Sequence, residues 1–199
     1  TKGTAVYPTP VVCALGLIDD VKKAISSGFK NDGDSVFLLG SDVVSDDINY
    51  LAGSEYLEVI HGLVAGQPRI DLNLEAKLQG CCRSLAENQL VNSAHDCSEG
   101  GLAVALAESS IIGNLGFSGT VGSIEHWASS LFGEQASRIV VSVSKDKIDQ
   151  FKNICHESDT PFVWLGTVTT GDFTISGIIH GSVQEISNAW KMGLNTALD

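Results

Sequence analysis

Residues 91–109 constrain the fold of this chain more than any other stretch. A run of small residues meets a polar cluster, His95 to Glu99, and the pair Gly100-Gly101 follows. An alanine-rich apolar segment with helical spacing comes next. Glycine pairs allow the backbone to turn sharply or to approach another segment closely. The stretch therefore predicts a strand, a tight polar turn and the start of a helix.

Two roles for this turn are open. Such a turn exposes N–H groups and the positive end of a helix dipole, which suits phosphate or carboxylate. It can equally be a capped helix start, and no G-x-x-x-x-G-K-[ST] phosphate loop occurs in the chain. We expect Asp96 or Ser98 to bond to N–H groups near Gly100 to Leu102, with any anion using the remaining donors. At least one of Gly100 and Gly101 should have a positive φ or no room for a Cβ atom.

The remaining pattern predicts an α/β (α+β) fold, a mixed β-sheet covered by helices. Strands are expected at residues 11–17, 21–29, 35–39, 116–122, 137–144, 163–168 and 173–179. Helices are expected within 49–63 and at 72–88, 127–132, 146–156 and 187–198. A short helix is the alternative for 21–29, and the last two strands should form a hairpin. Residues 1–9 are expected to be a linker and 10–199 one domain of a longer chain, because an initiator methionine is lacking.

Charge and hydropathy argue against two kinds of partner. The net charge is −12, and twelve basic residues are scattered among twenty-four acidic ones, whereas nucleic-acid binding needs clustered Lys and Arg. No apolar run approaches the roughly 18 residues of a transmembrane helix, and no secretory signal opens the sequence. We therefore expect no nucleic-acid partner, no membrane association and a cytoplasmic location.

The metal-binding residue types form no recognisable site. The five cysteines make no C-x-x-C pair, and the histidines show no metal spacing. Asp42, Asp46 and Asp47 lack the glycine and terminal glutamate of a calcium loop, so a solvated loop is the better interpretation. A nucleophilic Cys97 at a helix start is conceivable, but a buried apolar role is favoured. We assign no metal ligand.

A second stretch that could carry chemistry is residues 131–138. Glu134, Gln135 and Arg138 offer an acid, an amide and a guanidinium just before a predicted strand. Such groups can hydrogen-bond a polar ligand. The alternative is a structural ion pair between Glu134 and Arg138, and we favour that pair.

Four stretches resemble phosphoribosylformylglycinamidine synthase, of the aminoimidazole ribonucleotide synthetase superfamily. Residues 93–108, S-A-H-D-C-S-E-G-G-L-A-V-A-L-A-E, are similar to A-H-D-x-S-[DE]-G-G-L-A-V-A-L-A-E in the last domain of its synthetase subunit. L-A-G-S-E-Y at 51–56 resembles L-G-G-S-E-Y, and L-F-G-E-Q-A-S-R-I-V-V-S at 131–142 resembles L-F-G-E-x-x-x-R-x-V-V-S. P-T-P-V-V at 8–12 and G-L-I-D-D-V at 16–21 resemble the segment leading into that domain. The resemblance spans residues 7–168.

This resemblance implies a C-terminal-type domain over residues 10–199 and a place within an ATP-dependent ligase. Such an enzyme converts formylglycinamide ribonucleotide, ATP and glutamine-derived ammonia to formylglycinamidine ribonucleotide in purine biosynthesis. ATP and Mg²⁺ are then cofactors of the parent enzyme. Its partners are the remaining synthetase modules and a glutaminase subunit or domain.

The resemblance also implies that catalysis is centred elsewhere, because the catalytic histidine and magnesium ligands of the family lie in preceding modules. We assign no catalytic residue and expect the isolated chain to be inactive. The family's substrate-contacting E-S-Q triplet reads Glu134-Gln135-Ala136 here, so this module is not expected to bind substrate as the first module does. The candidate substrate- or nucleotide-binding residues are His95, Asp96, Ser98, Gly100, Gly101, Glu134 and Arg138. A non-catalytic nucleotide- or phosphate-binding module, or a subunit-docking module, is the alternative.

Overall fold

The computed structural model describes residues 10–40, 48–121 and 125–198. The expected linker at residues 1–9 and the aspartates Asp42, Asp46 and Asp47 lie outside this part of the chain. In the described ranges, no helix combines the length and apolar character needed to cross a membrane.

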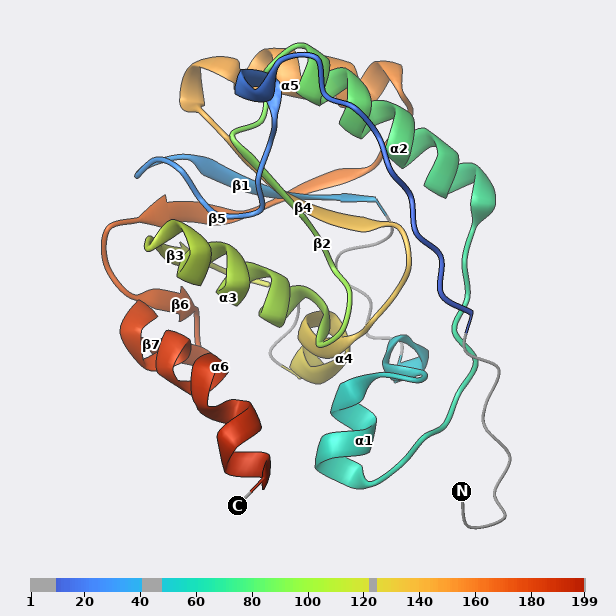
Figure 1. Ribbon diagram of the computed structural model, residues 1–199, viewed down its shortest axis with the longest axis vertical. Helices are drawn as coiled ribbons and strands as arrows, with labels where there is room; N and C mark the ends of the chain where they lie inside the picture. The colour runs from blue at the N-terminus through green and yellow to red at the C-terminus, as the bar shows by residue number, and fades with distance from the viewer. Residues whose placement is uncertain (1–9, 41–47, 122–124, 199) are drawn as a thin grey trace.

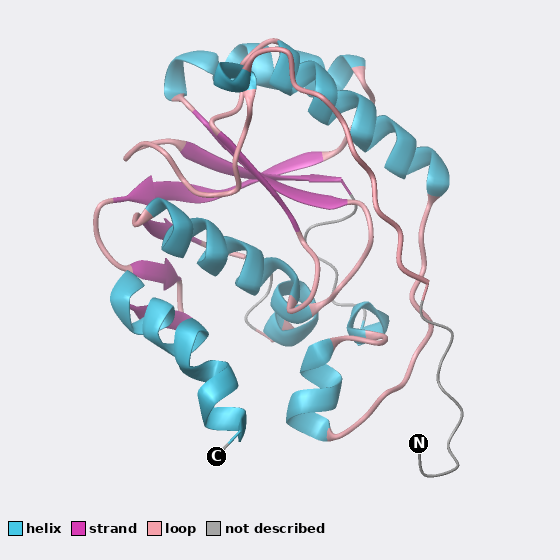
Figure 2. Cartoon of the chain, in the orientation of Figure 1, coloured by secondary structure: helices cyan, strands magenta, loops and turns pink. Residues whose placement is uncertain are grey.

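A mixed sheet runs through the centre of the molecule (Figure 2), and its seven described strands have the order β2-β4-β1-β5-β3-β6-β7. The strands are β1 (Ser35–Gly40), β2 (Ser93–Asp96), β3 (Gly116–Gly119), β4 (Arg138–Val143), β5 (Phe162–Thr169), β6 (Phe173–Ile175) and β7 (Ile179–Gly181). Neighbouring strands are antiparallel, except that β3 and β6 are parallel.

Helices cover both faces of this sheet, which confirms the predicted fold class. The helices are α1 (Glu55–His61), α2 (Leu72–Glu87), α3 (Gly101–Gly113), α4 (Trp127–Phe132), α5 (Ile148–Glu157) and α6 (Val183–Leu198), with 3₁₀ helices at Val21–Lys23, Ile48–Leu51 and Lys145–Lys147. In Figure 1, α2 and α5 lie on one side of the sheet and α3, α4 and α6 on the other.

β1 connects the two apolar layers because every residue of it is buried. Successive side chains of a strand point to opposite faces of the sheet. Phe37 and Leu39 belong to the cluster under α2 and α5, whereas Val36 and Leu38 belong to the cluster against α3 and α4. Burial on both faces explains why this segment is a continuous apolar run instead of an alternating one.

The start and the buried face of α2, one of these covering helices, follow from its sequence. The Asp71 carboxylate accepts hydrogen bonds from the N–H groups of Asn73 and Leu74, which caps the helix start. Leu78, Cys81 and Leu85 then place a fully buried stripe against the sheet. The helix predicted at residues 72–88 is confirmed.

The two strands predicted nearest the N-terminus are wrong. Residues 11–17 belong to no strand, and the exposed fractions of Val11 and Leu17 are 91% and 100%. Residues 21–29 contain the 3₁₀ helix Val21–Lys23 and a single bridge between Ser26 and Ser93. An apolar β-branched run becomes a strand only where another strand pairs with it, and none of the described strands pairs with residues 11–17.

The predicted hairpin between residues 163–168 and 173–179 is also wrong, although strands exist in both places. β3 lies between β5 and β6, so the hairpin is formed by β6 and β7 instead. Gly116 of β3 makes room for the crossing chain, because a Cβ atom there would lie 2.3 Å from the carbonyl oxygen of Gly171. Local turn residues cannot reveal a strand that enters from elsewhere in the chain.

Candidate functional site

The turn between β2 and α3 has the backbone that its glycines predicted. Gly100 and Gly101 have φ angles of 78° and 65°. A Cβ atom on Gly100 would lie 2.4 Å from Val104 Cγ2, and one on Gly101 would lie 2.7 Å from the Gly133 carbonyl oxygen. The glycines therefore let the start of α3 pack against the end of α4, and the expectation of positive φ and missing space is confirmed.

The expected capping by Asp96 or Ser98 is wrong. The Ser98 hydroxyl donates to the Asp96 carboxylate, and both residues are exposed. The N-cap position of α3 is Gly100, which makes no side-chain capping bond. A side-chain cap is normally supplied by the N-cap residue itself, and glycine has no side chain to supply it.

Glu134 takes the capping role instead. Its Oε1 atom accepts hydrogen bonds from the Gly100 N–H at 2.8 Å and from the Glu55 N–H at 2.9 Å. One carboxylate oxygen thus serves the first turns of both α3 and α1. A negative charge at two helix N-termini is favourable, because each terminus carries unpaired N–H groups and a partial positive charge.

Arg138 does not form the ion pair with Glu134 that we favoured. Its guanidinium is buried and donates from Nη1 to the Gly133 carbonyl at 3.1 Å and from Nη2 to the Ser130 carbonyl at 3.3 Å. Burial lowers the pKa of Arg138, since desolvation opposes the charged form. Arg138 therefore satisfies carbonyl groups at the C-terminal end of α4, where a cation is favoured.

His95 lies apart from the helix start and points to the flank of α3. Its Nε2 is 3.1 Å from Glu108 Oε2, and its Nδ1 is 2.8 Å from the Asp96 carbonyl oxygen. Glu108 Oε1 accepts a hydrogen bond from the indole N–H of Trp190 at 3.2 Å. His95 and Glu108 thus link β2 to α3 and α6, which is a structural arrangement and not that of a free base.

The candidate residues border two different pockets. Glu134 lines a pocket of about 490 Å³ together with Asn49, Tyr50, Ala52, Gln67, Pro68, Arg69 and Gln135. Asp96 and Arg138 instead border a smaller pocket of about 280 Å³, which also contains Glu75 and Ser137. The turn does not gather all the predicted residues around one ligand position.

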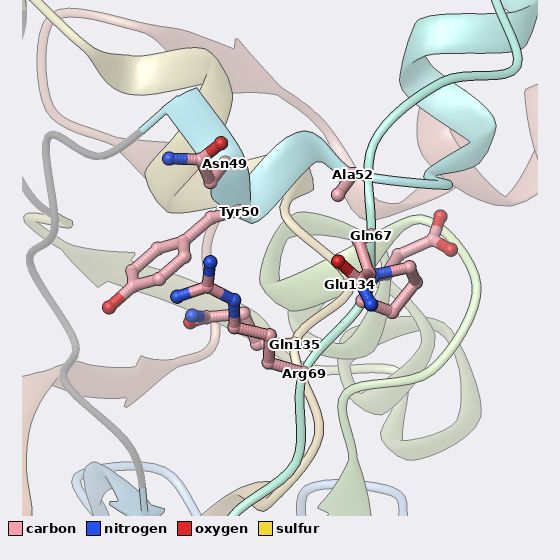
Figure 3. A pocket seen from close by; sticks show the side chains of 8 residues that line it. Asn49, Tyr50, Ala52, Gln67, Arg69, Glu134 and Gln135 are labelled. Carbon is pink, nitrogen blue, oxygen red and sulfur yellow. The ribbon is translucent and has the colours of Figure 1, made fainter.

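The larger pocket has groups suited to a polar ligand. In the view of Figure 3, Arg69, Tyr50 and Gln135 lie toward one end, and Gln67 and Glu134 toward the other. A guanidinium and amides can donate to phosphate or carbonyl oxygens, and a tyrosine ring offers an apolar face. No motif in the sequence marked Asn49, Tyr50, Gln67 or Arg69, and their nearness to the L-A-G-S-E-Y motif was the one clue.

The described residues contain no group of three or more His, Cys, Asp or Glu side chains that could hold a metal ion. Cys97 is buried, and burial raises the pKa of its thiol to about 11. A thiol that resists ionisation is a poor nucleophile, so the core role expected for Cys97 fits its surroundings.

The comparison with known proteins gives the family. The family model described as "AIR synthase related protein, C-terminal domain" matches residues 31–177. The chain belongs to this family. It is 38% identical over 198 residues to phosphoribosylformylglycinamidine synthase subunit PurL of Synechocystis sp., covering 95% of this chain and 25% of that protein. It is 46% identical over 173 residues to PurL of Synechococcus sp. strain JA-3-3Ab, covering 84% and 22%.

Solved structures share the fold. Thermotoga maritima PurL complexed with FGAR superposes with a TM-score of 0.69 at 20% identity, covering 84% of this chain and 30% of that chain. The predicted resemblance to the C-terminal domain of the synthetase subunit is confirmed by these relatives. The chain spans about a quarter of the length of the curated relatives it matches.

Proposed function

We propose that this chain is the C-terminal domain, residues 10–199, of the synthetase subunit of a phosphoribosylformylglycinamidine synthase. The parent enzyme would be an ATP-dependent, cytoplasmic ligase that forms formylglycinamidine ribonucleotide in purine biosynthesis. The sequence identity to PurL subunits across almost the whole chain carries this proposal. Solved PurL relatives in complex with ATP and with FGAR support the two substrates.

The domain's own role in this proposal is to complete a larger assembly. The large apolar side chains of residues 11–18 (Val, Leu and Ile) are between 66% and 100% exposed, and Val59 and Ile60 of α1 are 73% and 60% exposed. Soluble proteins seldom leave such groups of large apolar side chains uncovered, and they commonly mark an interaction surface. The remaining modules of the parent chain are the partners that would cover these surfaces, and Mg²⁺ would bind in those modules.

Ammonia would come from a glutaminase partner. A Thermotoga maritima relative has been solved as PurLQS, which supports an assembly of this kind for the parent enzyme. We assign neither glutamine hydrolysis nor the phosphoryl-transfer step to residues of this domain.

The proposal is tested by exchanging domains. The corresponding region of the Synechocystis subunit is replaced by this chain, and formylglycinamidine ribonucleotide is measured with FGAR, ATP, Mg²⁺ and ammonia supplied. We expect the chimera to form product, and each half alone to form none. A soluble, folded chimera that binds FGAR and ATP but forms no product would contradict the proposal.

A single substitution in this chimera tests whether the exposed apolar residues 11–18 contact the other modules. Leu17→Asp places a charge in the exposed apolar segment, and it should lower product formation by the chimera without unfolding the isolated chain. Asp19→Asn, directly after this segment, is the control and should leave the rate unchanged. The isolated chain is expected to release no phosphate from ATP. Phosphate release above that of a heat-inactivated sample would contradict this expectation.

A second candidate function, nucleotide or phosphate binding without turnover, is favoured by the pocket that contains Arg69. Titration of the chain with ADP and Mg²⁺ by calorimetry tests it. Arg69→Ala should abolish the binding heat, whereas Arg83→Ala on α2 should not. If neither variant changes the binding heat, ADP binds outside the pocket that contains Arg69. If the wild-type chain gives no binding heat, this second function is excluded, and docking to the other modules is the remaining role.

A further inference from the structure

Two buried thiols face each other between α2 and α5, on the opposite side of the sheet from α3. Cys81 of α2 and Cys155 of α5 are both fully buried, and their Sγ atoms lie 3.8 Å apart. The two residues are 74 positions apart in the sequence, so the contact is created by the packing of the helices. Nothing in the proposed function uses this pair.

The surroundings of the two sulfurs distinguish them. The hydrogen bond shared with Cys155 lowers the pKa of Cys81 against the effect of burial, which raises it, and Ser158 and Thr160 lower it further. The same bond raises the pKa of Cys155 together with burial. One proton is therefore held between the two sulfurs once Cys81 ionises. Such sharing favours a thiolate, the nucleophilic form of cysteine, beside a protonated neighbour.

A surface pocket lies beside one of the two fully buried cysteines. Cys155 borders a pocket of about 360 Å³, which is also lined by His156, Asp159, Thr160, Pro161 and Phe162. Neighbouring Cys82 is half-buried, and burial raises the pKa of its thiol to about 12. Of the two adjacent cysteines on α2, Cys81 is thus the one whose environment favours the thiolate.

We propose that Cys81 and Cys155 form a redox-active dithiol that closes to a disulfide under an oxidant of the hydroperoxide class. The Cys81 thiolate attacks one peroxide oxygen, which forms an S–O bond, breaks the O–O bond and releases hydroxide. The Cys155 sulfur then attacks Cys81 Sγ, which forms the S–S bond and breaks the S–O bond. The first hydroxide takes up the proton that Cys81 lost on ionising, and the second takes the Cys155 proton, so two thiols and one hydrogen peroxide give one disulfide and two waters.

The expected consequence is a covalent link between α2 and α5. A disulfide needs the sulfurs about 2.05 Å apart, so the side chains must rotate toward each other from 3.8 Å. Closing a loop of this length constrains the unfolded chain. The oxidised protein should therefore melt at a higher temperature than the reduced protein, by roughly 5–15 °C.

The test treats the reduced, folded 199-residue chain with hydrogen peroxide, quenches it with N-ethylmaleimide in denaturant and maps the peptides by mass spectrometry. We expect one linked peptide pair containing Cys81 and Cys155, a loss of two hydrogen atoms, and full reversal by dithiothreitol. Cys82→Ser should give the same linked pair. Cys155→Ser should give none, and its Cys81 should carry a sulfenic or higher oxidation state instead.

The oxidation of the exposed Cys13 shows how much oxidant the sample has received, because no part of the structure covers this thiol. Full oxidation of Cys13 with Cys81 and Cys155 still alkylated would overturn the proposal. A disulfide formed by Cys82 in place of Cys81, or one that joins two chains through Cys13, would overturn it as well. A Cys81→Ala, Cys155→Ala variant that shows the same rise in melting temperature on oxidation would exclude the link between α2 and α5 as its cause.

Discussion

The carboxylate of Glu134 accepts the N–H of Gly100 at 2.8 Å across thirty-four positions of sequence. The same oxygen accepts the Glu55 N–H at 2.9 Å. The L-F-G-E segment and the G-S-E-Y and E-G-G-L segments are therefore parts of one local structure, in which a single acid holds two helix starts together.

This relationship predicts the effect of replacing Glu134. Glu134→Ala leaves two N–H groups without their acceptor and should lower the free energy of unfolding by about 1–3 kcal/mol. Glu134→Gln keeps an oxygen that can accept both bonds and should cost less than about 1 kcal/mol. Urea denaturation at neutral pH measures both. Equal losses for the two variants would mean that the hydrogen bonds do not stabilise the fold.

The glycines of the turn make a second prediction. Gly100→Ala and Gly101→Ala each require positive φ and a Cβ atom where none fits, so each should destabilise the fold by more than about 1 kcal/mol. Gly193→Ala in α6 is the matched control, because its Cβ would meet nothing within 4 Å. That variant should be neutral or stabilising, since alanine favours helix over glycine. A similar loss at all three positions would contradict the account.

The link from Glu108 to His95 and Trp190 predicts how α6 is held. Glu108→Ala removes the carboxylate that contacts both groups and should speed amide hydrogen exchange in α6 and in β2. Glu157→Ala, at the end of α5, serves as the control for loss of a surface charge. Mass spectrometry of peptides from α6 and from β2 gives the measurement. Unchanged exchange in α6 after Glu108→Ala would show that apolar packing alone holds this helix.

A further prediction concerns pH. The Ser137 hydroxyl donates to Glu75 at 2.5 Å, and this bond, with a smaller one from Gln79, lowers the pKa of Glu75 below 4.5. A lowered carboxyl pKa stabilises the folded state above the unfolded pKa, and the contribution is lost as pH falls through the folded pKa. The stability difference between wild type and Ser137→Ala should therefore be constant near neutral pH and shrink below pH 4.5. A difference that grows in acid would refute this role of Glu75.

The strand, turn and helix around Gly100, the stripe of α2 and the mixed sheet could be read from the sequence, because each depends on periodicity or on backbone freedom over a short window. The side chain that accepts the hydrogen bond from the N–H group of Gly100 in this turn could not be predicted from the sequence. Glu134 is distant in sequence from Gly100 and Glu55, and Asp96 and Ser98 were nearer acceptors of the right type. We predicted capping by Asp96 or Ser98 because they lie closer to the start of α3 along the chain, and this prediction was wrong.

The errors in the sheet have the same origin. Residues 11–17 have the composition of a strand, but pairing depends on a neighbour that composition does not specify. Residues 163–168 and 173–179 are close in sequence, yet β3 separates them. The pocket with Arg69 was missed because it joins the 3₁₀ helix at Ile48–Leu51, the loop before α2 and the loop after α4.

The position of β3 between β5 and β6 also fixes the order in which the sheet can be completed. β6 pairs with β3 and β7 alone among the described strands, so the C-terminal hairpin has no sheet edge to join until β3 has docked on β5. β3 in turn must meet a strand that is synthesised about fifty residues later. Refolding followed by pulsed hydrogen exchange should thus protect the amides of β5 and β3 before those of β6, which leaves the C-terminal hairpin as the last part of the chain to escape proteolysis.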